Sequence, residues 1–339
     1  MARTAARRTR RQVPKLGRKA FEERFDRMVG NIGKVIKGKD EIIRLSLTCL
    51  LANGHILFED LPGTGKTMLC RSISQTMNAE YARVQCTPDL LPADITGSPV
   101  LERKTGNFIF RPGPIFASVF LADEINRATP KTQAALLEAM GEHSVTVDAV
   151  THQLPRPFFV LATQNPIELA GTFPLPEAQL DRFLFKLSLG YLTREAELDV
   201  LEANRTHEAI DDLTPIVETD EVTALIEWAA EVTISDGVLA YIVDLVHATR
   251  SDPALQVGAS TRAALALQRA SRVLAASQGR DDVLPDDIKS LVTPVMAHRV
   301  ILTPDAMLRD ETVEAVIERL LTRVKVPMAA KRSKGRASA

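Results

Sequence analysis

The segment between His55 and Thr67 carries residue types that could bind a nucleotide, because a short apolar run leads into a glycine-rich turn that ends in Lys66 and Thr67. Successive backbone N–H groups in such a turn point at a phosphate, and the N-terminus of the following helix adds the positive end of its dipole. Lys66 would reach the outer phosphates and Thr67 would hold Mg²⁺. An ordinary loop is the alternative for so short a pattern, but we favour phosphate binding.

The glycine-rich turn departs from the full phosphate-loop pattern at one position. That pattern has glycine six positions before the lysine, where this chain has Asp60. Gly63 and Gly65 remain around the tight part of the turn, so we expect the phosphate cradle to survive. The residues expected to bind the nucleotide there are Pro62, Gly63, Thr64, Gly65, Lys66, Thr67 and Met68.

Two adjacent acids follow a second apolar run, at residues 119–122. Hydrolysis of a γ-phosphate requires charge neutralisation, a positioned water and stabilisation of the transferring phosphoryl group. Asp123 can hold Mg²⁺ through water, and Glu124 is placed to polarise the attacking water. Capping of a helix, shared with Asn126, is the alternative, but the occurrence of both acids with Lys66 favours catalysis.

Asn165 follows a third apolar run, at residues 158–162. It places a polar amide where neighbouring strands place the phosphate loop and the acids, so it could orient water against the γ-phosphate. A turn residue before Pro166 is the alternative interpretation.

Two arginines further along the chain could also meet an anion. Arg182 lies beside Asp181 in the segment 175–185, which we expect to be an otherwise apolar helix; a surface ion pair between these two neighbours is the alternative. Arg262 falls in the first turn of a predicted helix, where a cation opposes the helix dipole. This unfavourable placement indicates an anionic partner.

The elements that would position these residues are short apolar strands that alternate with helices. Continuous apolar strands separated by helices indicate a parallel sheet covered on both faces. The expected strands are residues 56–58, 82–86, 119–122 and 158–162. The expected helices here are residues 18–28, 40–53 and 129–140, and β-hairpins are expected at residues 98–110 and 143–154.

After residue 190 the predicted strands stop and helical periodicity continues. Helices are expected at residues 193–204, 220–232, 236–250, 261–277, 285–298 and 310–324. We therefore predict an α/β domain, with a parallel central sheet flanked by helices, at residues 21–190. A smaller all-α lid domain follows at residues 191–326, and disordered basic segments occupy residues 1–20 and 327–339.

Composition limits the class of protein. The chain has 339 residues, enough for two domains, and its 45% hydrophobic and 25% charged residues are ordinary for a soluble globular protein. No stretch reaches the ~18 consecutive apolar residues that a membrane span needs. Cys49, Cys70 and Cys86 are irregularly spaced, which predicts buried thiols in a reducing cytosol rather than disulfides or metal ligands.

The net charge of −1 hides basic ends and an acidic body, because residues 1–20 carry eight Lys or Arg and residues 331–339 carry four. The first segment lacks the apolar stretch of a secretory signal. A transit peptide or a nucleic-acid arm is an alternative to solvated disorder. Since no aromatic residues interleave with these charges, we do not expect nucleic-acid binding.

The chain resembles the MoxR family of AAA+ ATPases from about residue 21 to residue 324. The motifs that carry the resemblance are Leu61-Pro-Gly-Thr-Gly-Lys-Thr67, Ala93-Asp-Ile-Thr-Gly97, Arg111-Pro-Gly-Pro-Ile-Phe116, Ala122-Asp-Glu-Ile-Asn-Arg-Ala128, Ala162-Thr-Gln-Asn-Pro166, Leu175-Pro-Glu-Ala-Gln-Leu-Asp-Arg-Phe183 and Gly258-Ala-Ser-Thr-Arg262. The resemblance implies Walker A, Walker B, sensor 1, arginine-finger and sensor 2 roles for Lys66, Glu124, Asn165, Arg182 and Arg262. It also identifies the two hairpins as the insertions of the helix-2-insert branch. Thr261 stands where the family often has proline, but no charged catalytic group is missing, so an active ATPase is expected.

The resemblance also implies a cytoplasmic ring, hexameric in similar proteins, with ATP and Mg²⁺ between neighbouring subunits. Arg182 would act on the nucleotide of a neighbour, and the residues acting in their own subunit would be Lys66, Thr67, Asp123, Glu124 and Asn165. Arg262 would report the nucleotide state to the lid, and Arg127 would face the subunit boundary. Val35 and Ile36 resemble the apolar strip that packs on adenine, with ordinary core packing as the alternative.

Similar proteins act as chaperone-like remodellers that assemble partner complexes or insert metal cofactors, often with a partner that carries a von Willebrand factor A domain. This is the function that we expect. A magnesium-chelatase-like motor subunit is one alternative. Another is a nucleic-acid-associated scaffold that uses the basic ends, with ATP controlling its assembly.

Overall fold

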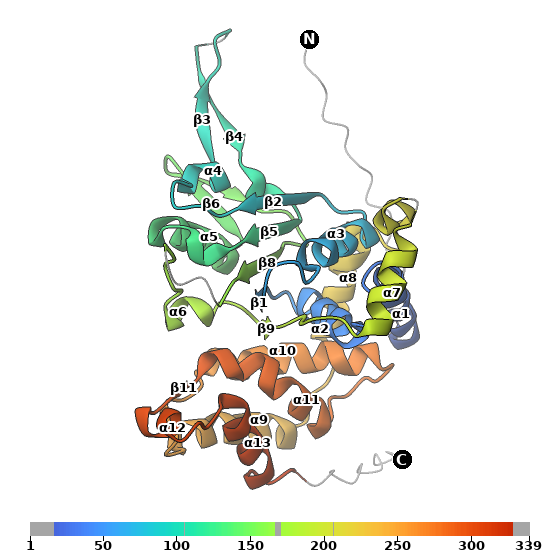
Figure 1. Ribbon diagram of the computed structural model, residues 1–339, viewed down its shortest axis with the longest axis vertical. Helices are drawn as coiled ribbons and strands as arrows, with labels where there is room; N and C mark the ends of the chain where they lie inside the picture. Colours follow the sequence, from blue (N-terminus) through green and yellow to red (C-terminus); the bar gives the residue numbers. More distant parts are fainter. Residues whose placement is uncertain (1–16, 105, 167–170, 206, 328–339) are drawn as a thin grey trace, which may run out of the picture.

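The centre of the fold is a five-stranded parallel sheet with the strand order β2–β5–β8–β1–β9 (Figure 1). The computed structural model describes residues 17–104, 106–166, 171–205 and 207–327. The strands are β1 (Ile56–Glu59), β2 (Tyr81–Gln85), β5 (Val119–Asp123), β8 (Phe159–Gln164) and β9 (Phe185–Leu187). The parallel sheet and four of its strands confirm the sequence prediction. Most of the predicted basic arm and nearly all of the tail lie outside the described residues.

Both faces of the sheet are covered, because successive strand residues point in opposite directions. In β5, Val119 and Leu121 belong to the larger hydrophobic core, whereas Phe120 and Ala122 belong to the second. The larger core includes the helices α1 (Arg18–Gly33), α2 (Asp40–Leu51) and α3 (Lys66–Thr76). The second core includes α5 (Pro130–Glu142). This covering explains why the strands are continuously apolar.

The fifth strand lies where the sequence predicts a helix. Instead of a helix over residues 175–185, the structure has a single turn, α6 (Glu177–Leu180), and then β9. Phe185, fully buried, pairs with Ile56 of β1 in parallel register. Burial at the sheet edge therefore overrides the local helical pattern, and Arg182 lies in the connection between α6 and β9.

Two antiparallel hairpins interrupt the α/β alternation, as predicted. The first joins β3 (Gly97–Leu101) to β4 (Phe108–Pro112) after the short helix α4 (Pro92–Thr96), and it projects away from the sheet (Figure 1). The second joins β6 (Ser144–Val147) to β7 (Val150–Gln153).

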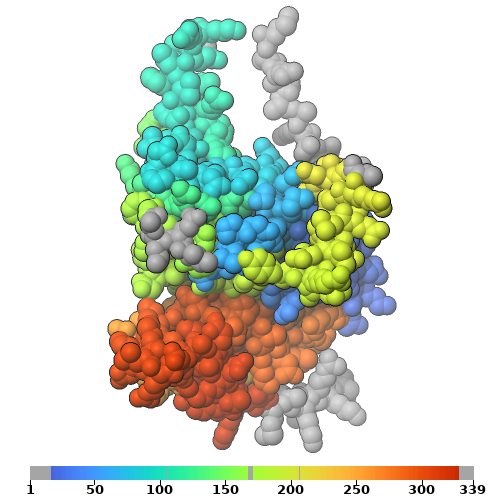
Figure 2. All heavy atoms as spheres, viewed as in Figure 1, coloured from blue at the N-terminus to red at the C-terminus, as the bar shows by residue number. Residues whose placement is uncertain are grey.

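The C-terminal helices form a layer below the sheet domain in the orientation of Figures 1 and 2. They are α9 (Asp236–Ser251), α10 (Thr261–Ser277), α11 (Pro285–Met296), α12 (Pro304–Leu308) and α13 (Val313–Arg323). A short antiparallel pair, β10 (Leu255–Val257) with β11 (Ile301–Leu302), joins this helical layer. Within this layer, α10 is the helix that packs against α1 and α2. It therefore lies at the boundary between the helical layer and the sheet domain.

Two further helices, α7 (Arg194–Ala203) and α8 (Thr219–Ala230), lie beside the sheet domain rather than in that layer (Figure 1). The connection before α8 is tied to α3, since Ile216 donates its backbone N–H to the carbonyl of Thr76 at 2.8 Å. The domain boundary at residue 190 remains a prediction.

Three properties of the chain follow from burial and helix length. Cys49, Cys70 and Cys86 are free thiols and each is at most 1% exposed, as the sequence predicts. Burial raises the pKa of Cys49 and Cys70, so these thiols stay protonated. Among the described residues, no helix is both long and apolar enough to cross a membrane.

Candidate active site

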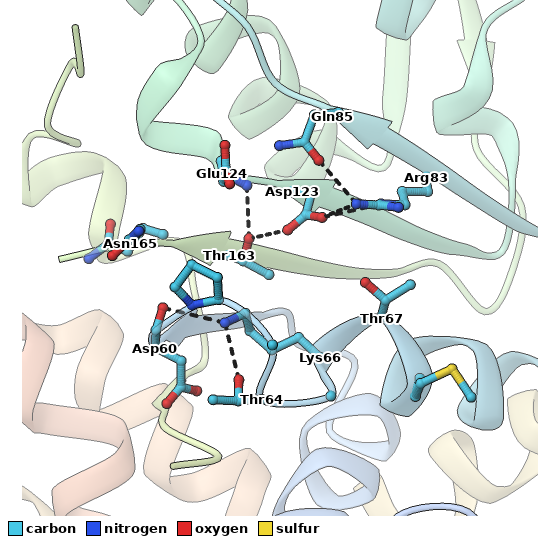
Figure 3. Close-up of a pocket in the computed structure, with 15 residues that line it drawn as sticks. Asp60, Thr64, Lys66, Thr67, Arg83, Gln85, Asp123, Glu124, Thr163 and Asn165 are labelled. Carbon is cyan, nitrogen blue, oxygen red and sulfur yellow. Dashed lines mark hydrogen bonds and ion pairs between the residues drawn. The ribbon is translucent and has the colours of Figure 1, made fainter. Parts of the chain in front are cut away.

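The phosphate loop connects the end of β1 to the start of α3, which begins at Lys66. Gly63 and Gly65 have φ angles of 81° and 95°, in the left-handed region that glycine adopts without a steric penalty. These two glycines let the chain turn tightly enough to present its N–H groups ahead of the helix. A cavity of about 400 Å³, called the phosphate cavity below, lies against the loop (Figure 3). Its lining residues from the loop and α3 are Asp60, Pro62, Gly63, Thr64, Gly65, Lys66, Thr67 and Met68.

Lys66 lies folded against its own loop. Its Nζ donates to the carbonyl of Leu61 at 2.8 Å. It also donates to Thr64 Oγ1 at 3.2 Å (Figure 3). Burial lowers the pKa of Lys66, and the carboxylates of Asp60 and Asp123 oppose that shift. Because these hydrogen-bond partners are neutral, the Lys66 ammonium group could exchange them for an anion in the cavity.

Asp123 ends β5 at the edge of the same cavity and has two polar partners. Its Oδ1 accepts a hydrogen bond from Thr163 Oγ1 at 2.6 Å, and its Oδ2 forms an ion pair with Arg83 Nη2 at 2.6 Å (Figure 3). Arg83 also donates to Gln85 Oε1 at 3.1 Å. Three neighbouring strands thus fix the orientation of this carboxylate.

Glu124 adopts a left-handed backbone conformation, with φ of 55°. Its N–H donates to Thr163 Oγ1 at 2.8 Å, and its carboxylate pairs with Arg127 Nη1 at 3.1 Å. Glu124 precedes the 3₁₀ turn η2 (Ile125–Arg127), yet its side chain makes no capping hydrogen bond there. The geometry therefore favours a role in the cavity over the capping alternative.

Asn165 lies one residue beyond β8 and lines the phosphate cavity, with 8% of its surface exposed. Its backbone carbonyl accepts a hydrogen bond from Asn126 Nδ2 at 3.4 Å. The structure thus brings together Lys66, Thr67, Asp123, Glu124 and Asn165, as predicted from the carboxyl ends of neighbouring strands.

Four lining residues were not identified from the sequence: Arg83, Gln85, Thr163 and Gln164. The available signal was the alternation of polar residues at the end of β2, which adjoins β5 with Gln85 opposite Asp123. Side chains at the carboxyl ends of parallel strands meet at one edge of a sheet.

The donors present fit Mg²⁺. Asp123 and Thr67 offer a carboxylate and a hydroxyl in one cavity, and Mg²⁺ usually takes one or two protein oxygens together with substrate phosphates. Within the described ranges, no group of three or more His, Cys, Asp or Glu side chains could hold a metal by itself. Any metal here would therefore take its remaining ligands from phosphate oxygens and water.

A second cavity, of about 200 Å³, also adjoins the loop. It shares Gly63 to Gly65 and Met68 with the phosphate cavity. Its apolar lining comprises Val35, Ile36, Met68, Leu189, Leu192 and Val200. Val35 and Ile36 also belong to the larger core, so packing and contact with an adenine ring are compatible.

Asp60 links the two cavities. Its buried carboxylate accepts hydrogen bonds from Ser188 Oγ at 2.7 Å and from the backbone N–H groups of Leu189 and Gly190 at 2.6 and 3.0 Å. Asp60 lines the phosphate cavity, whereas Leu189 and Gly190 line the apolar one. The residue that departs from the glycine pattern thus connects the phosphate loop to the wall of the neighbouring cavity.

Arg182 and Arg262 do not line the phosphate cavity of their own chain. They lie together in a separate cavity of about 460 Å³, which also contains Arg269 and Arg299. Arg182 Nη1 donates to the carbonyl of Leu137 at 2.8 Å. The two arginines thus form one basic surface, and the expected contact of Arg262 with a nucleotide remains a prediction.

Asp181 does not form the surface ion pair with Arg182 that was the alternative interpretation of this segment. Its Oδ2 lies 3.3 Å from Arg262 Nη1, and its Oδ1 lies 2.7 Å from Arg299 Nε. The acid thus connects the turn that carries Arg182 to the C-terminal helices.

Comparisons with known proteins match two separate parts of the chain. Residues 55–185 match the family described as ATPase family associated with various cellular activities (AAA), and residues 247–320 match the AAA lid domain. The chain is 46% identical to the uncharacterized protein YeaC of Bacillus subtilis, over 91% of this chain and 98% of that protein. It is 38% identical to Chaperone MoxR1 of Mycobacterium tuberculosis, over 89% of this chain and 82% of that protein. A crystal structure from Cytophaga hutchinsonii, of a protein assigned as an ATPase, superposes with a TM-score of 0.86 at 38% identity, covering 92% of this chain and 97% of that one.

Proposed function

The chain belongs to the MoxR family of AAA+ ATPases, and on this premise we propose that it hydrolyses Mg-ATP at sites shared by neighbouring subunits of a ring. The observation that carries the proposal is that the phosphate-loop residues and the two arginines line different cavities of the same chain. Lys66, Asp123 and Glu124 line one cavity, whereas Arg182 and Arg262 line another. A single subunit therefore offers the phosphate-binding half of a site and, elsewhere, the arginines that would complete a neighbour's site.

In the first half, the loop N–H groups and Lys66 would bind the phosphates, and the apolar cavity would receive the adenine ring. Thr67 and Asp123 would hold Mg²⁺, which neutralises charge on the phosphates. Glu124 would accept the proton of the attacking water, and Asn165 would orient that water. Thr163 supports both acids, because it donates to Asp123 and accepts from the Glu124 N–H.

In the second half, Arg182 would stabilise charge on the transferring phosphoryl group of the neighbour. An arginine supplied in this way raises the turnover of phosphoryl-transfer enzymes by a factor of about 10³ to 10⁵. Arg262 forms an ion pair with Asp181, the residue that precedes Arg182 in the chain. A hexameric ring is the assembly that we propose, as in similar proteins.

Complementation between subunits tests the shared site. Glu124→Gln subunits should bind ATP without hydrolysing it, and Arg182→Ala subunits should bind ATP and turn over slowly. Mixed rings should regain turnover, because each variant supplies the half that the other lacks. Full activity of Arg182→Ala as an isolated monomer would contradict the proposal.

For the biological role we propose remodelling of a partner protein complex, with a von Willebrand factor A domain protein as the adaptor. The relative named Chaperone MoxR1 supports the chaperone part of this role. Capture of a protein partner by the Glu124→Gln variant in ATP, but not in ADP, is the expected result. Capture of a chelatase component would favour a chelatase-like motor, and salt-sensitive DNA binding that disappears on deletion of residues 1–20 would favour a scaffold.

A further inference from the structure

Arg299 is a buried arginine that joins the C-terminal helices to the turn between α6 and β9. Its side chain is 3% exposed and lies at the end of the 3₁₀ turn η4 (Ala297–Arg299). The guanidinium donates to Asp181 Oδ1 at 2.7 Å, to the Phe183 carbonyl at 2.5 Å and to the Leu184 carbonyl at 3.2 Å. It also donates to the carbonyl of Val295, in its own helical layer. One side chain thus holds both sides of the domain boundary.

The turn held by Arg299 is the one that carries Arg182. His298 adds a further bond, with its Nε2 3.0 Å from the Phe183 carbonyl. On the side of the sheet domain, the Leu184 N–H of this turn donates to the carbonyl of His55 at 2.8 Å. The turn therefore lies between two supports, one in each layer.

The bonds to Arg299 are costly to break because the charge is buried. Burial lowers the pKa of Arg299, and Asp181 raises it again. A buried guanidinium that loses its carboxylate and carbonyl partners would leave an uncompensated charge. The turn and the C-terminal helices should consequently move together rather than separate.

Arg262 belongs to the same connected group. Asp181 Oδ2 accepts from Ser260 Oγ at 3.2 Å as well as pairing with Arg262, and both residues lie at the start of α10. The two arginines of the basic surface are therefore fixed to each other through Asp181 and Arg299.

We propose that Arg299 is a positioning residue for ATP hydrolysis by the neighbouring subunit. It fixes the turn that presents Arg182, so a displacement of the C-terminal helices of one subunit changes turnover in the next subunit around the ring. This inference rests on the proposed action of Arg182 on a neighbour's nucleotide.

The test uses Arg299→Lys in the full-length chain, because lysine keeps the charge but its three N–H donors cannot replace all the bonds from Arg299 to the Asp181 carboxylate and the surrounding carbonyls. Turnover should fall by roughly tenfold to a hundredfold, since a misplacement of about 1 Å can cost as much. Binding of Mg-ATP should stay within a factor of about two, as expected when only the transition state is affected. Mixing with Glu124→Gln subunits, which carry an intact Arg182 turn, should restore turnover at the Arg299→Lys sites.

Arg280→Lys is the matched control. Arg280 forms a forked ion pair with Asp287 at 2.6 and 2.9 Å in the same helical layer and does not line the cavity that holds Arg182. The Arg280→Lys variant should keep wild-type turnover even where its free energy of unfolding changes. Hydrogen exchange of the peptide that spans residues 177–187, measured without nucleotide, should rise in Arg299→Lys and not in Arg280→Lys.

Three results would overturn the inference. These are wild-type turnover in Arg299→Lys, an equal loss of ATP binding and turnover, or failure of Glu124→Gln subunits to rescue Arg299→Lys while they rescue Arg182→Ala. If Arg182→Ala is not rescued either, the action of Arg182 on a neighbour is wrong, and the inference falls with it. The Arg182→Ala reference thus separates failure of this inference from failure of the proposed function.

Discussion

Arg83 and Asp123 form an ion pair of 2.6 Å at the carboxyl ends of neighbouring strands, inside the phosphate cavity (Figure 3). The guanidinium occupies one oxygen of the carboxylate that would hold Mg²⁺. It also places a positive charge where phosphates would lie. Arg83 should therefore weaken the attraction of the site for the metal and strengthen its attraction for the nucleotide.

Substitution of Arg83 should separate these two effects. In Arg83→Gln, the half-saturating Mg²⁺ concentration for ATP hydrolysis should fall, and binding of ADP in EDTA should weaken. Each effect should be about 1 kcal/mol, the interaction of unit charges ~4 Å apart in water. Arg44→Gln, which removes a comparably exposed arginine paired with Asp26, is the control and should change neither value. An unchanged Mg²⁺ requirement in Arg83→Gln would contradict the competition.

Lys66→Ala should lose tight binding of Mg-ATP. Its ammonium lies among neutral partners in the cavity and can exchange them for phosphate oxygens. A charge-assisted bond is worth about 1.5 to 3 kcal/mol, so the dissociation constant should rise roughly tenfold or more. Calorimetric titration measures this, with the midpoint of thermal unfolding as the control for folding. Tight binding by a folded Lys66→Ala protein would refute the phosphate-loop assignment.

The phosphate cavity could be predicted from the sequence because its parts follow from local patterns. Asp123 comes directly after an apolar run, Asn165 comes three residues after another, and Lys66 ends the glycine-rich turn that follows a third. Parallel strands bring such positions to one edge of the sheet. Arg83 belongs to the same edge, because it alternates with Val84 and Gln85 at the end of β2. Pattern and geometry agree where each functional residue is fixed by its own strand.

The surroundings of Arg182 could not be predicted in this way. A local pattern favours a helix there, and only the pairing of Phe185 with Ile56 converts the segment to a strand. Arg299 reaches Asp181 across 118 positions of sequence, and Asp60 reaches Leu189 across 129. Contacts of this range depend on how distant segments of the chain pack together, which no short motif encodes.

Asp60→Asn should weaken adenine-nucleotide binding more than binding of inorganic triphosphate. The amide cannot accept all three hydrogen bonds that hold residues 188–190, so the wall of the apolar cavity should shift. The free energy of unfolding should also fall, by about 1 to 3 kcal/mol. Asp287→Asn is the control, because its carboxylate is equally buried and accepts the Leu284 N–H, but lines neither of the two cavities. Equal weakening of both ligands in Asp60→Asn would place the effect in the phosphate loop instead.

His55 should make the protein less stable in mild acid. Burial lowers its pKa from 6.5 to about 3. In the fold its Nδ1 accepts the Val160 N–H at 3.1 Å, and its Nε2 lies 3.3 Å from the Met140 carbonyl, so the neutral ring satisfies both. Below pH 6.5 the unfolded chain binds a proton that the folded chain does not, so the free energy of unfolding falls by about 1.4 kcal/mol per pH unit down to the folded pKa.

Urea unfolding at pH 7.5 and 5.5 checks this sign and its source. His298, whose pKa burial also lowers to about 3, should contribute in the same direction. In His55→Gln the amide can replace both hydrogen bonds without titrating, so the loss of stability between the two pH values should shrink. His207→Gln provides the opposite control, because Asp212 raises the pKa of the exposed His207, and removing a group of that kind cannot reduce the acid sensitivity. Equal acid sensitivity in the wild type and His55→Gln would show that the His55 ring does not carry the effect.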